Sequence, residues 1–266
     1  MHTQRSSFIS GDGVRIVYQF DGEVGLPTLL LSNSIGTDLH MWDEQIPWLA
    51  EHFQVLRYDA RGHGASDAPA GPYSLDRLGR DAVELLDALQ LQRAHVLGLS
   101  LGGYVGQWLG IHAPARVDRL VLSNTAAYLG PAATWDTAIE QLLQALDMVD
   151  TADTFMRNWF PQALLVSGNS VVERFRTTLL SARREGIAGS WAAVRDADLR
   201  RTVRLIESPT LVIAGEYDTV TSVHHGREIA AAVPGARFEV FPTVHLSNVE
   251  RPSEFVELVK GFLLTP

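Results

Sequence analysis

The sequence predicts an α/β fold in which helices flank a mostly parallel central sheet. Short apolar runs alternate with longer segments of helical periodicity along much of the chain. Strands that alternate with helices in this way form parallel sheets. Most of the runs lack regular polar positions, which is typical of strands that helices cover on both faces.

The composition is that of a folded protein with a full core. The chain has 266 residues, of which 46% are hydrophobic and 20% are charged, so a disordered chain is excluded. The net charge of -9 argues against partners that are polyanions, such as nucleic acid or an anionic lipid surface. The absence of cysteine excludes disulfides, thiolate catalysis and Cys-ligated metals.

No targeting or membrane-spanning segment is expected from the sequence. Met1 to Ser10 lacks the basic start and apolar run of a secretory signal. No apolar stretch reaches the roughly 18 residues that a membrane-spanning helix needs. We therefore expect a cytoplasmic protein that binds neither nucleic acid nor membrane, and the sequence carries no signal of its oligomeric state.

The predicted strands follow in order along the chain. Val14 to Phe20 alternates apolar and polar residues after the turn residues 11–13, which predicts an edge strand reached through a hairpin. Strands buried on both faces are predicted at four later apolar runs: Thr28–Ser32, Gln54–Tyr58, Ala94–Leu99 and Leu120–Ser123. Two further strands are predicted at Thr210–Ala214 and Arg237–Phe241.

Helices are predicted between these strands, together with one long helical insertion. The clearest helix begins after Ser74, a suitable N-cap, and a terminal helix follows Pro252. The segment 125–206 has no convincing strand and looks helical throughout. We therefore expect a core formed by residues 1–124 and 207–266, with residues 125–206 inserted as a helical cap.

The pattern Gly-x-Ser-x-Gly at residues 98–102 predicts a nucleophile at Ser100. The preceding run Ala94 to Leu99 reads as a strand, and a helix is predicted directly after the motif. A serine at such a sharp strand-to-helix turn stands clear of the sheet in a strained backbone conformation, and side chains in place of Gly98 or Gly102 would clash with neighbouring backbone. The helix start adds free N–H groups that favour an oxyanion.

An acid and a base follow later strands on the same sheet edge. Asp218 lies just past the strand that begins at Thr210, with Glu216 as the local alternative. His245 follows the strand that ends at Phe241. An imidazole takes the serine proton during attack, and a carboxylate on its far nitrogen fixes the tautomer. The chain order Ser100, Asp218, His245 is that of the α/β-hydrolase fold.

The oxyanion hole of this fold uses two backbone N–H groups. One is expected from Leu101, the residue after the nucleophile. The other is expected from Ile35, in the loop after the strand Thr28 to Ser32. Many relatives carry His-Gly where this chain has Asn33-Ser34, but a backbone donor needs no particular side chain.

Several segments together carry a more specific pattern. They are the run Ser-Asn-Ser-Ile-Gly-Thr at residues 32–37, Met-Trp-Asp at 41–43, the stretch 57–66 with Arg-Gly-His-Gly, Trp135, the cap segment 192–199, and His-Leu-Ser-Asn at 245–248 with Glu250 and Pro252. Over nearly the whole chain the sequence resembles the 3-oxoadipate enol-lactonases. The elbow and Arg-Gly-His-Gly are common to many α/β-hydrolases, whereas the 32–37 run and the cap segment point to the lactonases.

The resemblance implies hydrolysis of 3-oxoadipate enol-lactone in the β-ketoadipate pathway, with no metal or cofactor. Because this substrate carries a carboxylate, we expect a positive or hydrogen-bonding group in the pocket. Arg195 is a candidate for that group, and an ion pair of Arg195 with Asp196 or Asp198 is the structural alternative. Trp135 is expected either to line the pocket or to pack within the cap.

Other functions on the same fold stay open at this point. They are a general carboxylesterase, a cofactor-free perhydrolase, and a ligand-binding signalling module that keeps the triad but turns over slowly. A serine at the elbow weighs against dehalogenases and epoxide hydrolases, which use an aspartate there. A preference for small neutral aryl esters would favour the esterase, and a single burst without turnover would favour the module.

Overall fold

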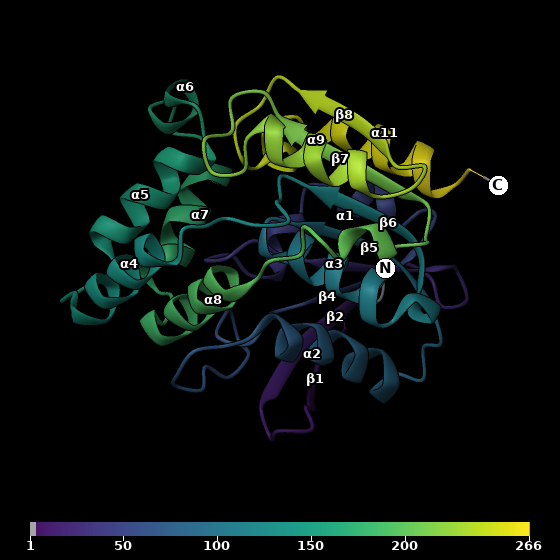
Figure 1. Ribbon diagram of the computed structural model, residues 1–266, viewed down its shortest axis with the longest axis horizontal. Helices are drawn as coiled ribbons and strands as arrows, with labels where there is room; N and C mark the ends of the chain where they lie inside the picture. The colour runs from purple at the N-terminus through teal and green to yellow at the C-terminus, as the bar shows by residue number, and fades with distance from the viewer. Residues whose placement is uncertain (1–3, 266) are drawn as a thin grey trace.

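The computed structural model describes residues 4–265. Within these residues one eight-stranded sheet has the order β1-β2-β4-β3-β5-β6-β7-β8 (Figure 1). Only the β1–β2 and β2–β4 pairs of this sheet are antiparallel. The strands are β1 (Gln4–Ile9), β2 (Arg15–Asp21), β3 (Thr28–Ser32), β4 (Gln54–Tyr58), β5 (Ala94–Leu99), β6 (Val117–Ser123), β7 (Thr210–Gly215) and β8 (Arg237–Phe241).

The expectation of an edge strand at residues 14–20 was wrong in one respect. That segment forms β2, but β2 lies inside the sheet because β1 pairs along its outer side from Gln4↔Phe20 to Ile9↔Arg15. Arg5, Ser6 and Ser7 are exposed. A polar edge strand of this kind carries no apolar run, so its sequence gives little signal.

Helices cover both faces of the sheet, as the unbroken apolar runs require. Successive residues of a strand point to opposite faces. Leu30 belongs to the apolar cluster that includes side chains of α2, α3 and α9, while Leu29 and Leu31 belong to the cluster that includes side chains of α1 and α11. These helices are α1 (Ile46–Leu49), α2 (Leu75–Ala88), α3 (Leu101–His112), α9 (Val223–Ala232) and α11 (Pro252–Leu263). Ser74 caps α2 as predicted, since its hydroxyl accepts from the Arg77 amide.

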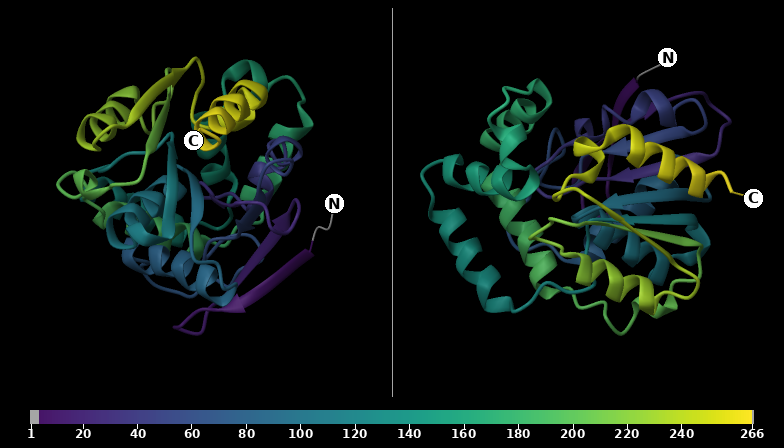
Figure 2. Two further views of the ribbon diagram at one scale, coloured as in Figure 1. Left: turned by 90° about the vertical axis from the view of Figure 1, so that its right-hand side faces the viewer. Right: turned by 90° about the horizontal axis from the view of Figure 1, so that it is seen from above.

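Five helices lie between β6 and β7 in the chain and stand together at one end of the sheet (Figures 1 and 2). They are α4 (Ala132–Gln144), α5 (Val149–Trp159), α6 (Gln162–Leu165), α7 (Ser170–Leu180) and α8 (Arg184–Asp196). This is the expected helical insertion, called the cap below, and its limits at residues 125 and 206 stay a prediction. Helix α8 lies so close to the core that a side chain on Gly186 would overlap the Gly62 carbonyl.

The remaining helical segments are short. They are α10 (Ser247–Glu250) and three 3-10 turns at Leu39–Trp42, Pro114–Arg116 and Val203–Leu205. Across residues 4–265, no helix has both the length and the apolar composition needed to span a lipid bilayer.

Candidate active site

Four polar residues follow four neighbouring strands at the same edge of the sheet. Ser100 follows β5, Asn124 follows β6, Asp218 lies just beyond β7, and His245 lies in the loop after β8. The pairs β5–β6, β6–β7 and β7–β8 are all parallel, so the carboxyl ends of these strands meet at one edge. Residues more than a hundred positions apart in the chain are thereby brought into one site.

Ser100 stands on the strained turn that its sequence motif predicts. Its backbone angles are φ 59° and ψ −115°, in a region that residues other than glycine rarely adopt. A side chain on Gly98 would overlap the Gly102 carbonyl, and one on Gly102 would overlap the Ser32 carbonyl. The expected clashes are confirmed, and both glycines are required for the strand and helix to approach so closely.

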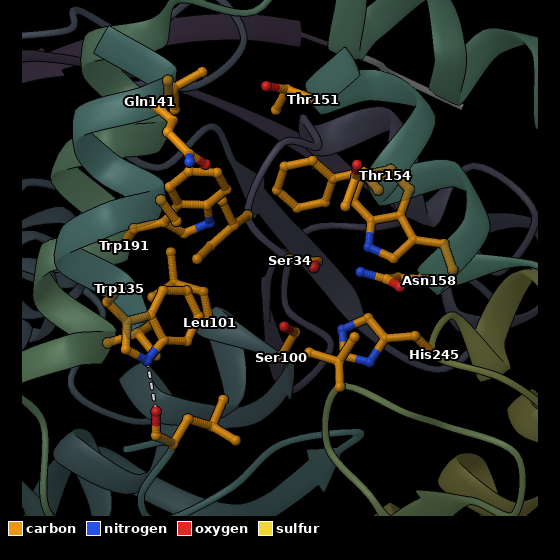
Figure 3. Close-up of a pocket in the computed structure, with 18 of the residues that line it drawn as sticks. Ser34, Ser100, Leu101, Trp135, Gln141, Thr151, Thr154, Asn158, Trp191 and His245 are labelled. Atoms are coloured by element: carbon orange, nitrogen blue, oxygen red, sulfur yellow. Dashed lines mark hydrogen bonds between the residues drawn. The ribbon is translucent and has the colours of Figure 1, made fainter. Parts of the chain in front are cut away.

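His245 is oriented by Asp218. Its Nδ1 lies 2.7 Å from Asp218 Oδ2, and both side chains are almost fully buried. Because an ionised carboxylate only accepts hydrogen bonds, Nδ1 carries the proton and donates it to Asp218. The other ring nitrogen, Nε2, is left as an acceptor, and His245 lines the same cavity as Ser100 (Figure 3).

The carboxylate of Asp218 is held by further donors besides His245. Oδ1 accepts from the amides of Val220 and Thr221 at 2.8 and 2.9 Å, and Oδ2 accepts from the Thr221 hydroxyl at 2.8 Å. Burial raises the pKa of Asp218, but the charge and hydrogen bond of His245 and the bonds from Thr221 outweigh it, and the pKa falls to about 2. The alternative acid, Glu216, is exposed.

Asn124 also holds the acid, and the sequence did not single it out. Its Nδ2 donates to Asp218 Oδ2 and to the Val244 carbonyl, both at 3.1 Å. The Ser123 hydroxyl donates to Asn124 Oδ1 at 2.8 Å, and Asn124 has a left-handed φ of 45°. Val244 directly precedes His245, so one buried amide contacts both the acid and the loop that carries the base. A polar residue directly after a buried strand is the signal that could have found it.

The two residues expected to supply the oxyanion donors line the same cavity. Ile35 and Leu101 both line it, and neither backbone N–H donates to another residue within 4–265. The Gly102 amide donates to the Asn33 carbonyl at 2.9 Å, which ties the β3 loop to the start of α3. Leu101 N–H is also one of the free donors at a helix N-terminus. The arrangement is suited to stabilising a negatively charged oxygen.

Asn33, where many relatives have histidine, braces the β3 loop through its side chain. Its Nδ2 donates to the Tyr58 carbonyl at 2.9 Å, and its Oδ1 accepts from Trp42 Nε1 at 2.8 Å. Both partners lie in the core. The departure from the common His-Gly pair therefore leaves the loop fully anchored, and the neighbouring Ser34 lines the cavity.

The cavity lies between the sheet edge and the cap and has a volume of about 500 Å³. Its walls are mostly apolar, with the side chains of Leu129, Trp135, Leu142, Phe155, Trp159, Trp191 and Val194 among them. Asp150 and His245 are its two ionisable lining residues besides Tyr104, and its lining contains no lysine or arginine. Within residues 4–265 no cluster of His, Asp or Glu side chains is arranged to hold a metal ion.

The structure brings one of the two predicted cap residues to the cavity. Trp135 lines it, with its ring 6.3 Å from that of Trp191, and its Nε1 donates to the Leu129 carbonyl. Arg195 does not line it. Its guanidinium bonds to Asp136 and Asp196, each at 2.7 Å, so the structural alternative holds for this arginine.

Comparisons with known proteins agree with this geometry. A family model described as alpha/beta hydrolase fold matches residues 27–252. The chain is 38% identical to 3-oxoadipate enol-lactonase 2 of Acinetobacter baylyi over 255 residues, which cover 96% of this chain and 95% of that protein. A second protein of that organism, 3-oxoadipate enol-lactonase 1, is 33% identical over 94% of each chain.

Two solved structures share nearly the whole fold. A hydrolase from Pseudomonas aeruginosa superposes with a TM-score of 0.97 at 60% identity, over 98% of this chain and 99% of that one. The enol-lactonase from Burkholderia xenovorans gives a TM-score of 0.95 at 37% identity, over 98% of this chain and 100% of that one. The chain therefore belongs to the α/β-hydrolase family, and it is similar over nearly its full length to 3-oxoadipate enol-lactonases.

Proposed function

We propose that the protein is a serine hydrolase that opens 3-oxoadipate enol-lactone to 3-oxoadipate, a late step in the catabolism of protocatechuate or catechol. The observation that carries the proposal is the imidazole of His245, bonded to Asp218 and facing the cavity that Ser100 lines. The similarity to two enol-lactonases over nearly the full chain supports the choice of substrate.

In the first half of the reaction Ser100 Oγ attacks the lactone carbonyl while His245 Nε2 takes the hydroxyl proton. The carbonyl oxygen becomes negatively charged and is stabilised by the N–H groups of Leu101 and Ile35, worth about 3 kcal/mol each. The bond between the carbonyl carbon and the ring oxygen then breaks. His245 returns its proton to the departing enol, which becomes a ketone, and the acyl group stays on Ser100.

In the second half a water molecule releases the acyl group. His245 takes a proton from the water, whose oxygen attacks the acyl carbonyl, and then returns it to Ser100 Oγ. The lactone carbonyl has become a second carboxylate. All proton transfers use His245, while Asp218 remains ionised and stabilises the imidazolium.

A general carboxylesterase is the second candidate, and the cavity lining favours it. The walls are mostly apolar and include no lysine or arginine, which suits a neutral ester at least as well as an anion. The same triad would serve both reactions, so the distinction lies in the rates on different substrates.

The loss of the enol-lactone's ultraviolet absorbance tests the proposal directly. With purified protein we expect kcat/KM for the anionic enol-lactone to exceed that for phenyl acetate by at least about tenfold, a difference of about 1.4 kcal/mol in transition-state binding. The reverse order, with phenyl acetate preferred, would establish the esterase instead.

A further inference from the structure

The enol-lactone carries a carboxylate, yet the cavity offers no cationic side chain to neutralise it. Of the ionisable residues that line the cavity, His245 belongs to the proposed triad, and Asp150 is negatively charged like the substrate and cannot neutralise it. Arg195 is held by Asp136 and Asp196 outside the lining. If this substrate binds, neutral hydrogen-bond donors must bind its carboxylate.

Helix α5 presents a polar stripe to the cavity. Thr151, Thr154 and Asn158 follow the spacing i, i+3, i+7, which places them on one face of the helix, and all three line the cavity. Figure 3 shows them on the wall opposite Trp135 and Trp191, with Asn158 beside His245 at the end of the stripe nearest the triad.

The members of the stripe differ in the donors they have free. The Thr154 hydroxyl donates its one proton to the Asp150 carbonyl at 2.9 Å and accepts from the Arg157 guanidinium at 3.1 Å, so it has no proton left for a ligand. The Thr151 side chain forms no hydrogen bond within the described residues, but it lies at the end of the stripe away from the triad (Figure 3). The half-buried Asn158 side chain forms no hydrogen bond with any residue in the described part of the chain. Its amide therefore has two N–H groups available in the cavity that Ser34 and Ser100 also line (Figure 3).

We propose that Asn158 is the residue that recognises the substrate carboxylate, by donating amide N–H groups to it from the cap. The inference rests on the proposed function and adds to it the group that selects an anionic lactone. A hydrogen bond from a neutral amide to a carboxylate is worth about 1.5–3 kcal/mol, or roughly tenfold to a hundredfold in binding.

Neutral recognition also suits the chemistry of the reaction. Ring opening turns the lactone carbonyl into a second carboxylate, so the product is a dianion while the substrate is a monoanion. A lysine or arginine in the cavity would bind this product more tightly than the substrate and retard its release. A neutral amide donor does not hold the dianion more tightly in this way. The negative charge of Asp150 in the cavity lining also favours release of the dianionic product.

The substitution Asn158→Leu tests the inference, because leucine is similar in size and the change removes no hydrogen bond found within residues 4–265. Kinetics are measured with the enol-lactone and with its neutral methyl ester. We expect KM for the anion to rise roughly tenfold or more with little change in kcat, as for a contact made equally in ground and transition states. The neutral ester, whose carbonyl accepts only a weaker hydrogen bond, should change in KM by no more than a few-fold and keep its kcat, which also shows that the variant is folded.

The charge of Asp150 supplies a second variant with the opposite expectation. Asp150→Asn should lower KM for the anionic lactone and leave that for the methyl ester unchanged. Glu140→Gln is the matched control, since Glu140 is exposed on α4 and lies outside the cavity lining. It makes the same change of charge and should leave both KM values as they are.

A pair of aryl acetates separates this inference from the proposed function. The anionic 3-carboxyphenyl acetate and the neutral phenyl acetate both carry their variable group on the leaving side, as the enol-lactone does. In one outcome the wild-type protein does not hydrolyse the enol-lactone, while Asn158→Leu still raises KM for the anionic acetate alone. That result would support recognition of the carboxylate by Asn158 and contradict the proposed substrate. Equal changes for the charged and neutral members of each pair, or no change for either, would overturn the inference.

Discussion

The ionisation of Asp218 is decided by its immediate neighbours. Burial favours the neutral acid, yet the imidazole of His245 and the donors of Thr221 lower its pKa to about 2. Its ordinary value is 3.8, so this carboxylate stabilises the fold fully above that pH and ceases to do so as the pH falls towards 2. A pH dependence of activity near neutrality must therefore come from groups other than Asp218.

Asn124 is expected to position the triad without touching the substrate. Asn124→Leu removes the donors to Asp218 and to the Val244 carbonyl, and we expect kcat to fall roughly tenfold or more, with KM much less affected. Asn124→Asp would place a second carboxylate about 3 Å from Asp218. That carboxylate should raise the pKa of the pair and move the acidic limb of the kcat/KM profile to higher pH.

Ser123→Ala is the matched control for Asn124, because it removes only the hydroxyl that donates to Asn124 Oδ1. Both donations from Asn124 are kept, so kcat should stay within a few-fold of wild type. A pH profile of Asn124→Asp that superposes on that of the wild-type protein would show that Asn124 plays no part in positioning the acid.

At the scale of elements, the turn between β5 and α3 is both the most constrained and the most predictable feature. Gly102→Ala should destabilise the protein by about 1–3 kcal/mol, since its methyl group would overlap the Ser32 carbonyl. It should also reduce kcat, because the Gly102 amide ties together the loops that carry Ile35 and Leu101. Urea unfolding measures the first effect and ester hydrolysis the second.

Gly261 provides the matched glycine for this test. It lies within α11, and nothing would lie within 4 Å of an added methyl group there. Gly261→Ala should therefore stabilise the protein by about 0.5–1 kcal/mol through helix propensity. Equal effects of the two substitutions on stability would contradict the tight packing described at Gly102.

The sequence predicted elements well where burial left a simple pattern. The bounds of β3, β4, β5 and β8 agree residue for residue with the predicted runs. For β3, β4 and β5 the reason is that strands covered on both faces need apolar residues throughout. Strand β8 lies at the sheet edge and is only partly buried, and its sequence mixes apolar and charged residues. Strand β1 was missed since an exposed edge carries polar side chains. The limits of the cap helices were not predicted, because short amphipathic helices leave no sharp boundary in the sequence.

The cavity is a property of the whole molecule, since it exists only where the cap meets the sheet edge. The dependence on packing explains why some site residues could be predicted from the sequence and others could not. The order of Ser100, Asp218 and His245 along alternating strands and helices was enough to propose the triad. The surroundings of Arg195 and Asn158 depend on how α4, α5 and α8 pack, and the partner Asp136 lies 59 residues from Arg195 in the chain.

The acid sensitivity of the fold should depend on His63, a buried histidine outside the cavity. Burial lowers its pKa from 6.5 to about 4, and its Nε2 has no hydrogen-bond partner within the described residues. The unfolded chain binds a proton near pH 6.5 while the folded chain does not, so stability falls as the pH drops through this range. The contribution of His63 to this loss is roughly 2 kcal/mol between pH 7 and pH 5.

Urea unfolding of wild type and His63→Gln at these two pH values measures that contribution. His95 and His225 also have lowered pKa values, and His40 has a raised pKa. Because these groups titrate in both proteins, the contribution of His63 is the difference between the stability losses of wild type and variant. The variant should lose roughly 2 kcal/mol less than wild type on acidification. An identical loss in both would show that His63 is not the group that resists protonation.

The most direct test of the central claim is covalent labelling of the nucleophile. The protein is incubated with a fluorophosphonate, and the adduct is located by mass spectrometry of its peptides. The account predicts one phosphonyl group on Ser100, no labelling of Ser100→Ala, and a fall in kcat of roughly a thousandfold or more in that variant. Labelling at another residue, together with near-wild-type turnover by Ser100→Ala, would contradict it.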